Sequence, residues 1–123
     1  MLTLLIAEKD KKCDSAVKFL DAAGVKYAKR DIIADRPSVD ELKKWIEMSG
    51  ASAFAFLRSG GFLLGGGLIA ERMAMMNDES RVAYLTATGK IIRRPLLVGE
   101  TFVLIGFDES TWLRRIKQIK SEQ

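Results

Sequence analysis

The sequence predicts an α/β domain built on a mixed four-stranded sheet, in the order βαβ, then helices, then ββα. Two observations predict this class. Roughly thirty residues at the N-terminus give an apolar run, a helical repeat and a second strand, an order typical of two parallel strands joined by a right-handed crossover. Near the C-terminus, two short apolar runs flank a glycine-containing turn, which predicts a hairpin, and an amphipathic helix follows.

In the N-terminal unit, residues 2–7 form an almost continuous apolar run, as in a strand buried on both faces. A charged loop follows, and Asp10 is placed to cap a helix that Gly24 ends. Residues 25–31 are the second predicted strand. The helix is indicated by buried-type residues at helical spacing, namely Cys13, Ala16, Val17 and Leu20.

The middle of the chain predicts an inserted group of helices. Ser38 and Glu41 form a capping box that starts a helix, and Gly50 ends it. Residues 51–77 give a weaker pattern, with turns expected at 58–61 and 65–67 and a helix at 68–76. Another short helix is expected from Asp78 or Ser80 to Gly89. The glycines at 65–67 lack the flanking residues of a phosphate-binding loop.

The C-terminal unit has strands predicted at residues 95–98 and 101–105, with Gly99 first in a two-residue type II′ turn. Asp108 is placed to cap the last helix. The basic face of that helix is expected to be solvated. Its apolar face is predicted to contain Trp112, Leu113, Ile116 and Ile119.

Length and composition favour one domain spanning residues 1–123. A single cysteine excludes an internal disulfide, and the lack of histidine removes the commonest metal ligand, so no metal site is expected. The net charge of +4 is too small to indicate direct nucleic-acid binding. The N-terminal apolar run is too short for a membrane span and lacks the features of a signal peptide, which favours a cytoplasmic location.

A parallel strand pair and an antiparallel hairpin flanked by helices form the thioredoxin-like layout, here with a helical insertion before the hairpin. Several segments, in order and at matching spacing, resemble the arsenate reductase (ArsC)/Spx family across almost the whole chain. The most specific are Arg-Pro-Leu-Leu-Val at 94–98 and Gly-Phe-Asp-Glu at 106–109; the others lie at 19–27, 30–32, 36–45 and 49–50. The resemblance implies a cis peptide bond before Pro95.

Catalytic members of the family carry a nucleophilic cysteine at the end of the first loop. An ungapped alignment puts Asp10 at that position and Cys13 at the second position of a Cys-x-x-Cys pattern. A gapped alignment would instead make Cys13 the nucleophile. The resemblance also implies that Arg58 and Arg94 bind an anion, whereas the region of a third arginine contains Gly106.

The sequence leaves the chemistry of the two N-terminal positions open. Asp10 would repel arsenate and is expected to pair with Arg94 or to cap the helix. Cys13 is either a buried core residue, as its helical face suggests, or a reactive thiol whose pKa is lowered by the helix start and by Lys11 and Lys12. Arg58 and Arg94 are either site residues or ordinary solvated arginines.

Three functions follow from the resemblance. The first is a binding or regulatory protein without arsenate reductase activity, as in the Spx branch, which regulates transcription by contacting RNA polymerase. The second is a monothiol oxidoreductase that uses Cys13 with glutathione or a redox protein. The third is an arsenate reductase. An aspartate at the nucleophile position favours the first and a non-enzymatic role.

Overall fold

The computed structural model describes residues 1–58 and 67–122. Its centre is a four-stranded sheet in the order β2-β1-β3-β4. β1 (Leu2–Ile6) pairs in parallel with β2 (Tyr27–Asp31) and antiparallel with β3 (Leu96–Val98), which pairs antiparallel with β4 (Val103–Ile105). The predicted mixed sheet is therefore confirmed.

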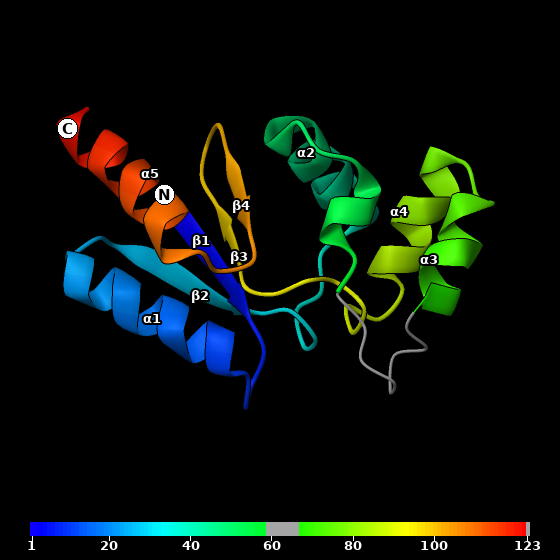
Figure 1. The fold of residues 1–123 in the computed structure, drawn as a ribbon, viewed down its shortest axis with the longest axis horizontal. Helices are drawn as coiled ribbons and strands as arrows, with labels where there is room; N and C mark the ends of the chain where they lie inside the picture. The colour runs from blue at the N-terminus through cyan, green and yellow to red at the C-terminus, as the bar shows by residue number, and fades with distance from the viewer. Residues whose placement is uncertain (59–66, 123) are drawn as a thin grey trace.

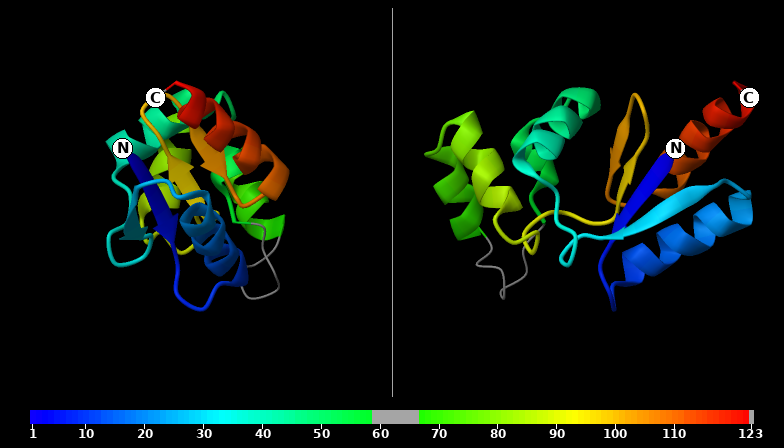
Figure 2. Two further views of the ribbon diagram at one scale, coloured as in Figure 1. Left: turned by 90° about the vertical axis from the view of Figure 1, so that its left-hand side faces the viewer. Right: turned by 180° about the vertical axis from the view of Figure 1, so that it is seen from behind.

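Helices cover both faces of this sheet (Figures 1 and 2). α1 (Lys11–Ala23) and α5 (Glu109–Ser121) pack on one face. The other face is covered by the insertion, which consists of α2 (Val39–Ser49), the 3₁₀ turn η1 (Ala53–Phe56), α3 (Gly67–Ala74) and α4 (Asp78–Thr86). The sheet thus separates two hydrophobic cores.

The central strands are apolar at successive positions because each side chain enters one of these cores. Leu4 pairs with Leu97, and both lie in the core under α1 and α5. Leu5 pairs with Leu96, and both lie in the core under the insertion. Alternation along a strand sends neighbours to opposite faces, so a strand covered on both faces needs a continuous apolar run.

The predicted helix starts are confirmed. The carboxylates of Asp10 and Asp108 accept hydrogen bonds from main-chain N–H groups three residues later. Ser38 forms the predicted reciprocal capping box with Glu41. Each cap satisfies N–H groups that a helix leaves without a partner in its first turn.

The hairpin turn differs from the prediction. Gly99 donates to the carbonyl of Phe102 (2.9 Å) just beyond the last ladder pair, Val98 and Val103, so the turn is centred on Glu100 and Thr101. Gly99 does not have a positive φ. A Cβ atom there would lie 2.3 Å from the Phe102 ring, so a larger residue at position 99 would force the ring to move.

Two further expectations are corrected. α4 ends at Thr86 rather than Gly89, and Gly89 has φ +74 with its Cα against the carbonyl of Ile32. In α5, Trp112 and Ile116 are buried as predicted, but Leu113 is 42% exposed because its position turns away from the sheet. The predicted turns at 58–61 and 65–67 fall mostly outside the described residues. No helix in the described part of the chain is long and apolar enough to cross a membrane.

Candidate functional site

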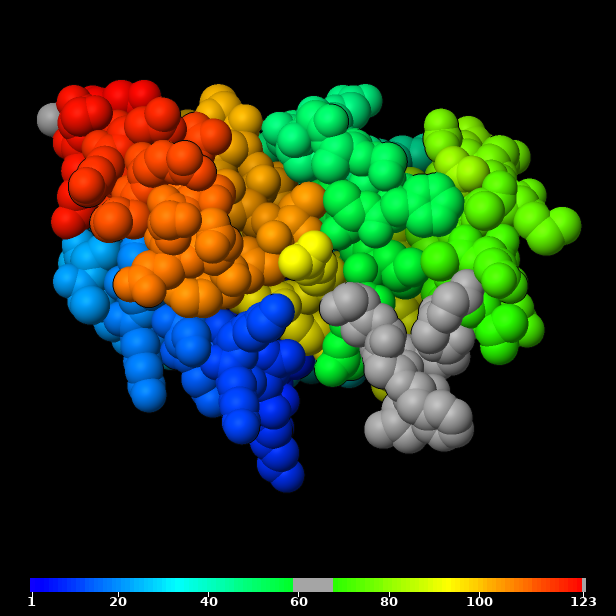
Figure 3. All heavy atoms as spheres, in the orientation of Figure 1, coloured from blue at the N-terminus to red at the C-terminus, as the bar shows by residue number. Residues whose placement is uncertain are grey.

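A cleft of about 470 Å³ opens where the first loop, the end of β2 and the segment before β3 meet. It brings together three of the residues singled out from the sequence, Asp10, Arg58 and Arg94. In Figure 3 the N-terminal loop projects from the lower edge of the molecule. The complete lining is Ala7, Glu8, Lys9, Asp10, Asp31, Ile33, Ala34, Arg58 and Arg94.

Arg94 is the most buried charged side chain of the cleft, with an exposed fraction of 7%. Its guanidinium turns back onto its own chain. Nε donates to the carbonyl of Ile92 (2.9 Å), and Nη2 donates to the carbonyls of Gly89 (2.7 Å), Lys90 (3.0 Å) and Ile92 (2.7 Å). The peptide bond from Arg94 to Pro95 is cis, as the resemblance implies.

The carbonyl of Gly89 reaches Arg94 because of a close approach between backbones. A Cβ atom at Gly89 would lie 2.3 Å from the carbonyl oxygen of Ile32, so only glycine fits there. The sequence predicts Gly89 as a helix terminator and gives no sign that its carbonyl binds the Arg94 guanidinium. A lone glycine after a helix carries no signal that separates these two roles.

Arg58 reaches the cleft through a short antiparallel contact between two loops. Leu57 forms an isolated bridge with Ile92, and main-chain hydrogen bonds flank it on either side. These bonds join the N–H of Arg58 to Ile91 (2.7 Å) and the N–H of Arg93 to Phe56 (2.8 Å). Burial and the neighbouring Arg58 lower the pKa of Arg94, as expected for two close cations.

Asp10 caps α1 rather than pairing with Arg94. Its Oδ1 accepts from the N–H of Cys13 (3.0 Å), and within the described residues no ion pair joins Asp10 to Arg94. Of the two expectations for Asp10, the helix cap is the one observed.

Asp31 was not predicted as a site residue. It ends β2 beside the end of β1, opposite Ile6. Its Oδ1 accepts from the N–H groups of Ile33 (2.8 Å) and Ala34 (2.9 Å), and these bonds lower the pKa of the carboxyl group. The sequence could have indicated Asp31, because it ends the second of two predicted parallel strands, and ligands commonly bind at the edge of a sheet where the carboxyl ends of such strands meet.

Cys13 lies next to the cleft but does not line it. Its side chain is 1% exposed, and the sulfur accepts a hydrogen bond from the N–H of Ala7 (3.5 Å). Burial raises the pKa of the thiol to about 11, with Asp10 adding to the rise, while the N–H of Ala7 and Arg94 act in the opposite direction. The thiol environment therefore matches the buried core alternative, and the pKa shift is opposite to that of an activated cysteine.

The parallel β1–β2 pair, the hairpin that follows a cis proline and the helices on both faces define a protein of the thioredoxin-like class. A candidate ArsC family related protein from Bacteroides fragilis is 33% identical, with a TM-score of 0.85 over 92% of this chain and 95% of that chain. The chain therefore belongs to the ArsC family.

Two further proteins are similar to most of the chain. A candidate arsenate reductase from Streptococcus mutans UA159 is 27% identical, with a TM-score of 0.80 over 93% of this chain and 98% of that one. YusI, an uncharacterized protein of Bacillus subtilis (strain 168), is 29% identical over 79% of this chain and 82% of its own length. No protein-family model matches the chain.

Proposed function

We propose that this protein is a binding or regulatory member of the ArsC family that does not reduce arsenate. The state of Cys13 is the observation that carries the proposal. Because the thiol is buried and its pKa is raised to about 11, the protonated thiol predominates at neutral pH. A reductase of this kind needs a thiolate that can reach its substrate.

The carboxylate of Asp10 supports the same conclusion. It occupies the start of α1 and faces the cleft that contains Arg58 and Arg94. An arsenate held about 4 Å from this carboxylate would be repelled by about 4 kcal/mol per pair of unit charges at a surface-like dielectric. The two arginines are thus kept in a cleft that disfavours the substrate of a reductase.

The alternative function, a monothiol oxidoreductase, makes the opposite prediction for Cys13. The test compares alkylation of the native protein by iodoacetamide at about pH 8 with that of a matched control, Cys13→Ala combined with Lys12→Cys. The control carries its one thiol at the neighbouring, exposed position. We expect native Cys13 to react at least about a hundredfold more slowly, and to react at the rate of a free thiol in denaturant.

Arsenate-dependent oxidation of glutathione or glutaredoxin provides the second arm. We expect no turnover above the rate of a sample without protein. Arsenate turnover that disappears in Cys13→Ala would overturn the proposal. Alkylation of native Cys13 as fast as the control would instead establish the oxidoreductase.

A further inference from the structure

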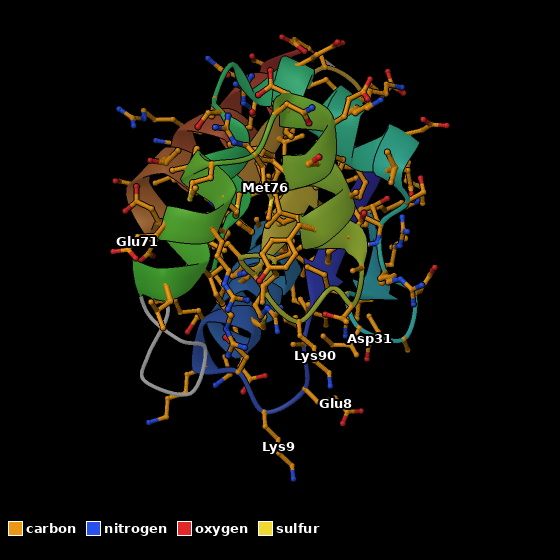
Figure 4. The ribbon with its side chains drawn as sticks, turned by 90° about the vertical axis from the view of Figure 1, so that its right-hand side faces the viewer. Glu8, Lys9, Asp31, Glu71, Met76 and Lys90 are labelled. Atoms are coloured by element: carbon orange, nitrogen blue, oxygen red, sulfur yellow. The ribbon has the colours of Figure 1, made fainter. Side chains whose placement is uncertain are left out.

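The cleft is lined by charges of both signs in equal number. The positively charged lining residues are Lys9, Arg58 and Arg94. The negatively charged ones are Glu8, Asp10 and Asp31. Figure 4 shows Glu8, Lys9 and Asp31 at one end of the molecule, with Glu8 and Lys9 extending away from its body, whereas Glu71 lies on the helical insertion. A site for a simple oxyanion would not be expected to place the carboxylates of Asp10 and Asp31 beside its arginines, since each repels the ligand.

Arg94 lies close enough to the carboxylates of Asp10 and Asp31 for them to act on its pKa, but among the described residues no ion pair joins it to either. The salt bridges in the described parts of the chain include none between two residues of the cleft. Asp10 and Asp31 each use only Oδ1, and each uses it to accept main-chain N–H groups. Their Oδ2 atoms have no protein donor among the described residues. The cleft therefore presents cations and carboxylates that are both available to a ligand.

Arg94 is the most firmly held cation of the cleft. Only 7% of the residue is exposed, and its Nε and Nη2 donate hydrogen bonds to main-chain carbonyls. Arg94 also lines the cleft, together with Arg58, Asp10 and Asp31. Buried arginine donors are normally satisfied.

We propose that the cleft binds a small zwitterion, a molecule with one carboxylate and one ammonium group, as in free amino acids and short peptides. The carboxylate contacts Arg94 and Arg58, and the ammonium group contacts Asp31 and Asp10. A cleft of about 470 Å³ is of the size that small-molecule sites have. The inference names the ligand class of the site and rests on the binding function proposed above.

Ligands with one sign of charge fit less well. A sulfate or arsenate would satisfy the arginines and leave the carboxylates repelling it. A metal ion would meet the arginines, and within the described residues no group of three or more carboxylate or cysteine side chains is arranged to hold one. A zwitterion can pair its carboxylate with the arginines and its ammonium group with the carboxylates at the same time. Such charge complementarity favours it over ligands that carry one sign of charge.

The test measures dissociation constants by NMR titration of the full chain with glycine, glycylglycine, sulfate and methylammonium. Asp31→Asn removes one negative charge but keeps the Oδ1 acceptor of the turn after β2. Arg58→Gln removes one positive charge. Asp40→Asn and Arg114→Gln, which are exposed and outside the cleft, are the matched controls.

We expect glycine or glycylglycine to bind more tightly than sulfate or methylammonium. If glycine binds more tightly than glycylglycine, the ligand class is a free amino acid; if glycylglycine binds more tightly, it is a short peptide. Arg58→Gln should weaken the zwitterion about five- to tenfold and also weaken sulfate. Asp31→Asn should weaken the zwitterion by a similar factor but tighten sulfate. The control variants should change neither constant.

Two outcomes overturn the inference: no saturable binding of either zwitterion, or an affinity for zwitterions that Asp31→Asn leaves unchanged while sulfate binds. The second outcome would make the cleft a simple anion site. Neither outcome bears on arsenate turnover or on the reactivity of Cys13, so failure of this inference can be told apart from failure of the proposed function. Thermal unfolding of each variant checks that the fold is intact.

Discussion

Residues 10 and 13 are joined by a hydrogen bond across the first turn of α1. Asp10 caps α1 by accepting the N–H of Cys13, and the Cys13 sulfur is in turn bound by the N–H of Ala7. The capping bond is worth about 1 kcal/mol to a helix. A cysteine at position 10 would give up that bond while gaining a nucleophile at the open edge of the cleft.

We predict that Asp10→Cys forms a reducible disulfide with Cys13. The two positions are three residues apart and meet across the first turn, where the side chain of residue 10 already reaches the N–H of residue 13. Mild oxidation should reduce the count of free thiols from two to none in denaturant, and dithiothreitol should restore both.

Lys11→Cys is the matched control, because residues two apart on a helix do not face each other. It should keep two free thiols under the same oxidation. If Asp10→Cys also keeps both, then Asp10 does not occupy the first position of a Cys-x-x-Cys arrangement, and the ungapped alignment is wrong.

At the scale of elements, the contact between β2 and the start of α2 is the best-defined ion pair. Arg30 on β2 donates from Nη1 and Nη2 to the two carboxylate oxygens of Glu41, at 2.7 and 2.9 Å, and its guanidinium lies 5.9 Å from the centre of the Trp45 ring. Glu41 also completes the capping box. One carboxylate thus joins the sheet to the helix and caps that helix.

We predict that this pair makes stability depend on pH in the acid range. The hydrogen bonds from Arg30 lower the pKa of Glu41 from 4.5 to about 2. A lowered folded-state pKa stabilises the fold above the unfolded value, and the contribution is lost as pH falls from about 4.5 towards 2. Glu41→Gln should lower stability by about 1 kcal/mol at neutral pH, since the pair is partly exposed.

The measurement is urea unfolding of wild type and Glu41→Gln at several pH values. The difference between them should shrink as pH falls through this range. Glu47→Gln, an exposed position on the same helix, should follow the wild type throughout. A difference between wild type and Glu41→Gln that does not change with pH would mean that the carboxylate charge is not what stabilises the contact.

The hairpin supplies a second test at this scale. Gly99→Ala should lose about 1–3 kcal/mol of stability, because the new methyl group would overlap the Phe102 ring in a packed environment. Gly24→Ala is the comparison: it has φ +70 but nothing within 4 Å, so its loss of about 1–2 kcal/mol would come from the backbone conformation alone. Wild-type stability of Gly99→Ala in chemical unfolding would contradict the steric explanation.

Local rules account for what sequence could predict of the elements. Capping residues and terminal glycines act within a few residues, so the starts of α1, α2 and α5 were predictable. The centre of the hairpin turn was not, because it depends on which residue faces Gly99 across the hairpin. Asp10 and Arg94 were identified from the family pattern. Asp31 was not, because it is brought to the cleft by the parallel pairing of β1 with β2, which places it beside the end of β1.

On the scale of the whole molecule, each face of the sheet packs against its own hydrophobic core, and the two cores differ in composition. The core under α1 and α5 contains three edge-to-face aromatic contacts among Phe19, Phe107 and Trp112, with ring centres 5.0–6.4 Å apart. The core under the insertion contains Phe56 and Trp45 among mostly aliphatic side chains. Continuous apolar strands predicted burial on both faces, but the helices that cover each face follow from the tertiary fold.

We predict that changes in the two cores act independently. Ile92→Val and Ile116→Val remove one methylene from opposite cores, and each should cost about 0.5–1.5 kcal/mol. Because the sheet separates the sites, the double variant should lose the sum of the two within about 0.5 kcal/mol. Denaturant unfolding of the four proteins gives the coupling energy, and a larger value would show that the sheet transmits strain between its faces.

The way Arg94 is held has a consequence for the thermodynamics of any ligand that binds beside it. An arginine side chain gives up about 2 kcal/mol of rotamer entropy when it becomes fixed. In this protein the carbonyls of Gly89, Lys90 and Ile92 impose that loss during folding. A ligand therefore meets a donor that is already oriented, and that part of its affinity carries no further ordering cost.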